Sequence, residues 1–358
     1  MKSQRIHGMD FARAVLMTLG IIYHSALIYV PNPSWAMQSG QSASFFASLT
    51  TFTSSFRMHA FYVIAGFFFL LIIQKKGVNS AVKDRIVKLG IPLLFVGFTI
   101  NFVANALAMN YSFPENPLMY VIKGEWMRHL WFIGNLIVYC YALSLVISIF
   151  KKISAYKLFT TAILIGVSPI LIAVTKDQIW RFTGYDNFMF IYPRNLVIFL
   201  PYFLLGAFLY LHKEAALRLI NIKNLILLSV LTILLMALRT KVDGLTGNFI
   251  SEYYSMSASL TAITLLCLLG NKGSEKVREF TDASYTIYLI HSPIIMVLFY
   301  FFFTDSYLSL WLQYIILVTA TFIICYLIHH LLIDKIPPLA LLMNGKKTPT
   351  GQAKGLPE

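Results

Sequence analysis

Long apolar stretches dominate this chain, and only short polar segments connect them. Ten of the stretches approach the roughly 20 apolar residues that a helix needs to cross a bilayer. They lie near 11–30, 57–73, 86–109, 129–150, 158–175, 189–211, 222–239, 253–270, 283–303 and 309–333. We therefore predict an all-α, polytopic membrane protein of about ten transmembrane helices. It should form a single domain over residues 1–343, followed by a polar, disordered tail at 344–358.

The composition and the placement of charge agree with this class. The 358 residues are 58% hydrophobic and only 12% charged, with a mean hydropathy of +0.71, unlike a soluble domain. With the N-terminus inside, twenty Lys and Arg residues fall in cytoplasmic segments and seven in the opposite loops. The positive-inside rule then predicts that both termini are cytoplasmic. The net charge of +14 follows from this topology and favours anionic lipid head groups; no basic arm indicates nucleic-acid binding.

Two ionisable residues in the first apolar stretch point to a buried function. Arg13 and His24 are eleven residues apart, which brings them to nearly the same face of a helix, about 16 Å apart along its axis. Ionisable residues in a spanning helix are costly and usually serve a site or a polar pathway. The pair therefore predicts a polar route through most of the membrane.

Other polar residues gather at the same two levels of the predicted bundle. The outer level holds Arg57, His59, Glu125, Arg128, His129, Arg194 and Glu252, and the inner level holds Arg85 and Lys88. A neutral histidine such as His24 can remove a proton from a hydroxyl, and an inner basic patch can hold an anionic, phosphorylated donor. This arrangement favours transfer of a group across the membrane.

Simpler interpretations of these residues stay open. His59 and His129 fit interfacial or packing positions, and Arg85 and Lys88 fit ordinary cytoplasmic positive charges. His291, close to Pro293, fits a histidine that bonds to freed backbone carbonyls. The three cysteines fall inside predicted spans, so we expect neither a disulfide nor a metal site.

Five segments of the chain, taken in order, carry the motifs of one known family. The first is an Arg-x10-His element formed by Arg13 and His24, with Asp10 three residues ahead of Arg13. The others, in the second, fourth, sixth and ninth predicted helices, are SFRMHAFYVIAGFFF, RHLWFIGNL, LPYFLLGAFL and ASYTIYLIHSPI. Together they resemble the acyltransferase type 3 family of integral-membrane O-acyltransferases, and within it the glucans biosynthesis protein C group. Lys88 replaces the second arginine of the family's usual Arg-x-x-Arg pair, which keeps the charge but loses the planar fork.

The resemblance implies an enzyme of the bacterial inner membrane that moves an acyl group, succinyl above all, from a cytoplasmic acyl-CoA to a hydroxyl of periplasmic osmoregulated glucan. It implies no permanently bound cofactor and no metal. The expected catalytic residues are His24, Arg13 and Asp10, and the expected donor-binding residues are Arg85, Lys88, Tyr285 and His291. The expected acceptor-binding residues are Arg57, Glu125, His129, Arg194 and Glu252, and Arg57 or Arg194 could also hold a succinyl carboxylate. No role is carried over to His59.

Three alternatives remain at this stage. The chain could O-acetylate another cell-surface polysaccharide, or it could be a transporter or flippase that passes a solute along the same polar track. A polysaccharide polymerase or assembly component is the third. A transporter would be expected to show paired repeats with matching broken helices, and the sequence shows no such pair.

Overall fold

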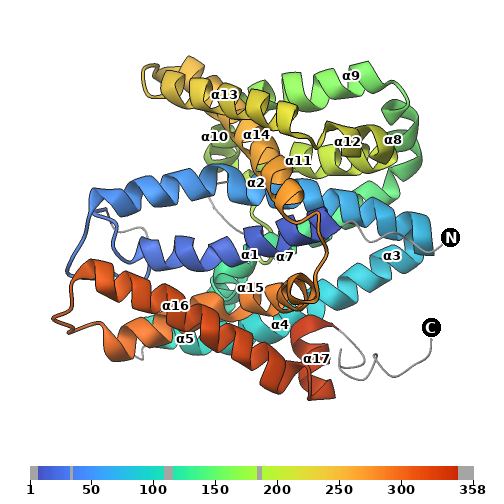
Figure 1. The fold of residues 1–358 in the computed structure, drawn as a ribbon. Helices are drawn as coiled ribbons and strands as arrows, with labels where there is room; N and C mark the ends of the chain where they lie inside the picture. Colours follow the sequence, from blue (N-terminus) through green and yellow to red (C-terminus); the bar gives the residue numbers. More distant parts are fainter. Residues whose placement is uncertain (1–6, 33–34, 109–115, 184–187, 346–358) are drawn as a thin grey trace. The chain divides into compact units, whose positions relative to one another are not determined.

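The computed structural model describes residues 7–32, 35–108, 116–183 and 188–345, which are almost entirely helical (Figure 1). Within these residues there is no β-strand, and one isolated bridge joins Phe188 and Ile191. The all-α prediction is therefore confirmed. The predicted tail falls mainly on residues 346–358, which lie outside the described residues. Asn344, its first predicted residue, instead ends a helix and is buried.

Eight helical stretches among the described residues are long and apolar enough to cross a membrane. They are Ser44–Lys76, Val78–Ala108, Lys157–Lys176, Pro193–Leu211, Ile222–Arg239, Gly244–Leu269, Glu275–Phe302 and Leu310–Ile333. A ninth is added if Arg128–Leu145 and Ile147–Ser154, bent by 78°, count as one broken span. The remaining predicted span corresponds to α1 (His7–Leu27), whose polar side chains lower its hydropathy.

The chain divides into two compact units, each built from separated parts of the sequence. The first unit takes Met1–Leu16, Ser55–Arg85 and Asn135–Arg278, and the second takes Met17–Ser54, Ile86–Gly134 and Glu279–Glu358. Four helices contribute residues to both units: α1, α2 (Ser44–Lys76), α7 (Trp131–Leu145) and α15 (Glu275–Phe302). The prediction of a single domain stays a prediction, as does the cytoplasmic location of the termini.

In the first unit, the backbones of α2 and α11 (Pro193–Leu211) approach each other closely. A Cβ atom added to Gly66 of α2 would collide with the carbonyl oxygen of Phe203, and one added to Gly206 of α11 would collide with that of Val63. The two glycines therefore let the helices approach closely. The other helices of this unit are α3 (Val78–Arg85), α8 (Ile147–Ser154), α9 (Lys157–Thr161), η3 (Ala162–Val167), α10 (Ser168–Thr183), α11 (Pro193–Leu211), α12 (Lys213–Leu219), α13 (Ile222–Arg239) and α14 (Gly244–Leu269).

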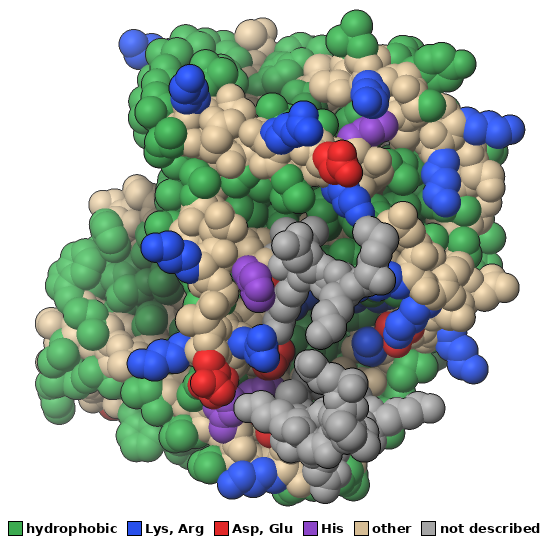
Figure 2. Space-filling view, turned by 45° about the vertical axis from the view of Figure 1, so that its right-hand side comes forward, with side chains coloured by type: hydrophobic (Ala, Val, Ile, Leu, Met, Phe, Trp, Pro, Cys, Tyr) green, Lys and Arg blue, Asp and Glu red, His purple; other side chains and the backbone are tan. Residues whose placement is uncertain are grey.

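Helix α13 shows how the outer surface of the first unit is built. It packs along α14 through hydroxyl contacts of Thr232 with Ser257 (2.8 Å) and Thr261 (3.0 Å). None of its residues is buried, although most are leucine or isoleucine. Figure 2 likewise shows hydrophobic side chains over large parts of one face. Such surfaces suit contact with lipid chains, as a polytopic membrane protein requires.

The second unit contains all of α16 (Leu310–Ile328) and most of α15, two long apolar helices near the C-terminus (Figure 1). The hydroxyl of Tyr29 donates to the side-chain oxygen of buried Gln313 (3.3 Å), and that of Tyr314 donates to the carbonyl of Ile22 (3.3 Å). These bonds hold α16 against the second half of α1 and the residues that follow it. The other helices are η1 (Ile86–Gly90), α4 (Ile91–Phe98), α5 (Ile100–Ala108), α6 (Pro117–Ile122), η2 (Arg128–Leu130), η4 (His329–Ile333) and α17 (Pro337–Asn344).

Candidate active site

Three histidine side chains from distant parts of the chain meet inside the second unit. His24 lies in the last turn of α1, His129 in the short helix η2, and His291 in α15. The ring centroids of His24 and His291 are 5.1 Å apart, those of His129 and His291 are 5.1 Å apart, and those of His24 and His129 are 6.1 Å apart. His129 and His291 are buried, and His24 is half-buried. We call these three residues the histidine cluster.

A proline in α15 fixes the protonated nitrogen of His129. Pro293 has no N–H, so the carbonyl of Leu289, four residues earlier, lacks its usual helical donor. Nε2 of His129 lies 3.1 Å from that carbonyl oxygen. Because a carbonyl only accepts, Nε2 must carry the proton, and Nδ1 carries the lone pair. Nδ1 is buried and makes no hydrogen bond with any described residue.

The tautomer of His291 is fixed in the same way by its own helix. Its Nδ1 lies 2.7 Å from the carbonyl oxygen of Tyr288 and 3.1 Å from that of Ile287. Nδ1 therefore carries the proton and Nε2 the lone pair. The interpretation of His291 as a residue that bonds to backbone carbonyls is thus correct, but the carbonyl freed by Pro293 goes to His129. Two imidazole rings, each held by a backbone carbonyl, therefore lie beside His24.

Buried asparagines and a tyrosine hold the loop that presents His129. Asn101 donates to the carbonyl of Met127 (2.9 Å), and the hydroxyl of Tyr288 donates to the carbonyl of His129 itself (2.9 Å). Arg128 has a φ of 47°, in the left-handed region, and its guanidinium donates to the side-chain oxygen of Asn105. These bonds stabilise a backbone conformation that few residues other than glycine adopt.

Neither asparagine was predicted from the sequence to contribute to the site. The available signal was the occurrence of Asn101 and Asn105 in an otherwise apolar segment, since buried polar groups require partners. Trp35 was missed as well. Its ring lies 5.8 Å from that of His24 and is half-buried, so it forms part of the wall next to the cluster.

Asp10 and Arg13, the other expected catalytic residues, form an ion pair in the first half of α1. Their side-chain atoms are 3.1 Å apart, and the Arg13 guanidinium lies 5.2 Å from the ring centroid of Phe68. Both residues belong to the first unit. Helix α1 is continuous from His7 to Leu27, so Arg13 and His24 lie on one helix, as predicted.

The expected donor-binding residues are divided between consecutive segments. Arg85 is the last residue of α3, and Lys88 lies in the π-helix η1 that follows. The structure brings Lys88 together with Tyr285, whose hydroxyl donates to the Lys88 carbonyl (3.2 Å). His291, which the sequence grouped with them, lies in the histidine cluster.

Not all of the expected acceptor-binding residues lie in surroundings that are typical of a binding site. Glu252 is buried and accepts a hydrogen bond from Nζ of Lys176 (2.7 Å), so its charge is balanced within the first unit. Arg57 is half-buried on α2, and Arg194 is exposed at the start of α11. Glu125 is exposed in the turn after α6, in the second unit.

His59 packs as a structural residue. Its ring contacts Phe199 and Tyr202 at centroid distances of 4.8 and 4.7 Å, in the first unit. This aromatic environment agrees with the expectation that no catalytic role falls to His59. The three cysteines are buried and free, as predicted.

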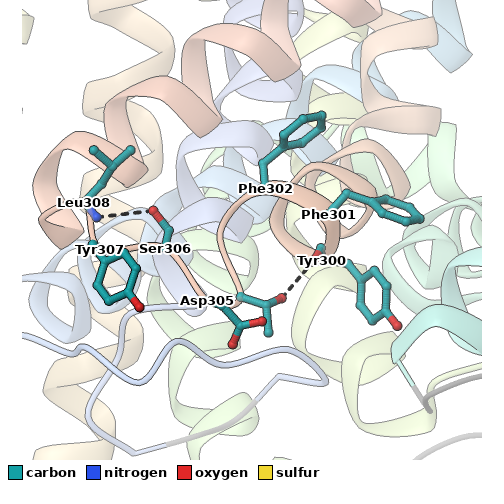
Figure 3. Close-up of a pocket in the computed structure, with 8 residues that line it drawn as sticks. Tyr300, Phe301, Phe302, Asp305, Ser306, Tyr307 and Leu308 are labelled. Carbon is teal, nitrogen blue, oxygen red and sulfur yellow. Dashed lines mark hydrogen bonds between the residues drawn. The ribbon is translucent and has the colours of Figure 1, made fainter.

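A separate surface pocket of about 470 Å³ lies where α15 ends and the chain turns toward α16 (Figure 3). It is lined by Tyr300 to Phe302 and Thr304 to Leu308. The Thr304 hydroxyl donates to the Tyr300 carbonyl (3.0 Å), and the Leu308 N–H donates to the Ser306 hydroxyl oxygen (3.2 Å). None of the three clustered histidines lines this pocket, so it adds nothing to the candidate site.

Comparison with known proteins identifies the family. An acyltransferase domain model matches residues 6–330. Glucans biosynthesis protein C of Escherichia coli K12 is 27% identical over 383 aligned positions, which cover 96% of this chain and 95% of that protein. The proteins of the same name from E. coli O157:H7 and O6:K15:H31 show the same identity and coverage. No solved structure matches the chain. The chain that carries the histidine cluster therefore belongs to this acyltransferase family.

Proposed function

We propose that the protein transfers a succinyl group from a cytoplasmic acyl-CoA to a hydroxyl of a periplasmic glucan, with His24 as the general base. The observation that carries the proposal is the meeting of His24 with two buried histidines, His129 and His291, in one cluster. The family supplies the reaction type, and the relatives' name, glucans biosynthesis protein C, motivates the acceptor.

The chemistry needs one base and one leaving group. The acceptor oxygen attacks the thioester carbonyl carbon, a C–O bond forms, and the C–S bond breaks. The hydroxyl proton passes to His24, and the departing thiolate of coenzyme A takes up a proton to become the free thiol. The hydrogen bonds of His129 and His291 to backbone carbonyls hold both rings in fixed orientations beside His24.

The two substrates would approach from opposite ends of α1. The positive-inside prediction places Arg13, Arg85 and Lys88 toward the cytoplasm, where acyl-CoA is made. The nucleotide end of the donor binds the basic segment, and its flexible arm carries the thioester outward over the roughly 16 Å between Arg13 and His24. Trp35 then offers an aromatic surface to the sugar rings of the acceptor on the outer side.

A transporter is the less favoured function. Paired repeats would give matching broken helices, and the described residues contain a single strongly bent pair, Arg128–Leu145 with Ile147–Ser154. A transporter would also leave its substrate chemically unchanged.

The test uses purified protein in sealed, oriented vesicles with isotope-labelled succinyl-CoA or acetyl-CoA and a periplasmic glucan. Mass spectrometry should detect labelled succinyl esters only when the donor is on the cytoplasmic side and the glucan on the other. Labelled acetyl esters alone would correct the donor. Glucan that crosses the vesicle without modification, or transfer with both substrates on one side, would overturn the proposal.

A further inference from the structure

A second cluster of ionisable side chains lies at the end of α16, outside the histidine cluster. His329, His330 and Asp334 each offer one ligand atom, and these atoms all lie within 4.8 Å of one another. Nε2 of His329 is 3.4 Å from Oδ2 of Asp334, and Nδ1 of His330 is 3.5 Å from the same oxygen. No other group of this tightness occurs among the described His, Cys, Asp and Glu residues.

A π-helical turn makes this arrangement possible. In an α-helix, residues five apart point about 140° away from each other, so His329 and Asp334 would face different sides. Here residues His329–Ile333 form η4, and the N–H of Asp334 donates to the carbonyl of His329 (2.9 Å). This wider i to i+5 turn stacks Asp334 above His329. π-Turns within α-helices occur frequently at functional sites.

A chain of hydrogen bonds orients the ring of His329. The hydroxyl of Thr286 on α15 donates to Oδ1 of Asn344, the last residue of α17 (3.1 Å). A hydroxyl has one proton, so Thr286 must accept from Nδ1 of His329, 2.8 Å away. Nδ1 therefore carries a proton, and Nε2 is the nitrogen that faces the Asp334 carboxylate. A cation between Nε2 and the carboxylate would stabilise this close approach.

We propose that His329, His330 and Asp334 bind a divalent transition-metal ion, Zn²⁺ in the first instance. Zn²⁺ binds imidazole nitrogen and carboxylate oxygen at about 2.0–2.2 Å, which separates tetrahedral ligands by about 3.4 Å. Both measured histidine–aspartate separations match this value. Thr286 supplies the hydrogen bond that metal-bound histidines normally make through their second nitrogen. His330 and Asp334 are 31% and 20% exposed, so water can complete the coordination.

The ion would brace the part of the second unit that supports the active site. Thr286 lies between Tyr285, which bonds to the carbonyl of Lys88, and the turn that carries His291. Asn344 ties α17 to the same point. Metal binding at η4 therefore stabilises α15 and α17 together. This site departs from the expectation, made from the sequence, that the protein binds no metal.

The experiment measures zinc directly. The full-length protein, purified in detergent and stripped with a chelator, is dialysed against micromolar Zn²⁺, desalted and analysed by inductively coupled plasma mass spectrometry and thermal unfolding. We expect one ion per chain and a higher midpoint of unfolding with zinc, since an ion that binds only the folded state stabilises it. Asp334→Asn and His330→Ala should lose both effects. Asp305→Asn, which removes an exposed carboxylate between α15 and α16, should retain both.

A second pair of variants leaves all three ligands in place. Thr286→Val removes the acceptor for His329 Nδ1 and should weaken zinc binding about 10–100-fold, whereas Thr286→Ser keeps the hydroxyl and the affinity. Absence of zinc from the unsubstituted protein would overturn the proposal. Equal zinc content in Asp334→Asn, or equal affinity in Thr286→Val and Thr286→Ser, would overturn it too.

Discussion

His129 donates a hydrogen bond to the backbone carbonyl of Leu289, 3.1 Å away, and this carbonyl is available only because Pro293 has no N–H. A proline that would otherwise weaken α15 thus frees the carbonyl of Leu289 to hold the ring of His129, 160 residues away from Leu289 in sequence. The lone pair of His129 is left on Nδ1, the nitrogen that makes no hydrogen bond with described residues.

Pro293→Ala should lower turnover without unfolding the protein. Alanine restores an N–H that competes for the Leu289 carbonyl, so His129 loses a hydrogen bond worth about 0.5–1.5 kcal/mol, or up to about tenfold in rate. The measurement is kcat for acyl transfer together with the unfolding midpoint. Pro201→Ala, in α11, is the matched control because it removes a helix proline from the first unit. Unchanged turnover in Pro293→Ala would show that this bond does not position His129.

His24→Ala should reduce acyl transfer by about 10²–10⁴, the usual cost of losing a general base, while the protein remains folded. His24 is half-buried at the end of α1, so its removal leaves no large cavity in the helix core. His212→Ala is the control, because it also removes a histidine ring, but one that lies in the first unit and bonds to the Ser154 carbonyl. Near-normal turnover of His24→Ala with saturating donor would rule out the assigned role.

The sequence predicted the parts of the fold that depend on local pattern. Each predicted apolar stretch corresponds to a helix or to the bent pair, because roughly 20 apolar residues in lipid have few alternatives to a helix. His24 and His129 were expected at one level of the bundle, and the structure brings them together.

Long-range pairing accounts for what the sequence did not show. His291 was grouped with the donor site because its distance from His24 depends on how α15 packs, which periodicity does not specify. The partner of Glu252 is Lys176, 76 residues away, and no spacing rule connects them. The turn at η4 is a departure from α-helical geometry, so a helical wheel places His329 and Asp334 on different faces.

Arg85→Ala should raise the KM for the acyl-CoA donor more than the KM for the acceptor. The guanidinium lies at the end of α3, in the segment predicted to be cytoplasmic, where it can pair with phosphate. Lys88→Arg should keep donor use, since arginine retains the charge and adds a planar fork. Lys83→Ala, at an exposed lysine of the same helix, is the control. If Arg85→Ala leaves the donor KM unchanged, the charge of Arg85 serves to orient the chain in the membrane and not to bind the donor.

Glu252→Gln should destabilise the first unit, because it leaves the ammonium group of Lys176 buried without its counter-charge. The two side chains are 8% and 14% exposed, and breaking a buried pair typically costs about 3–5 kcal/mol. The double variant Glu252→Leu with Lys176→Met removes both charges and should recover most of that stability. The unfolding midpoints of Glu252→Leu, of Lys176→Met and of the double variant, all measured in detergent, give the coupling energy between the two side chains. The double variant also separates the two roles of Glu252. If it is stable and transfers acyl groups normally, Glu252 serves only to balance Lys176; if it is stable but its acceptor KM rises, the predicted role in acceptor binding stands.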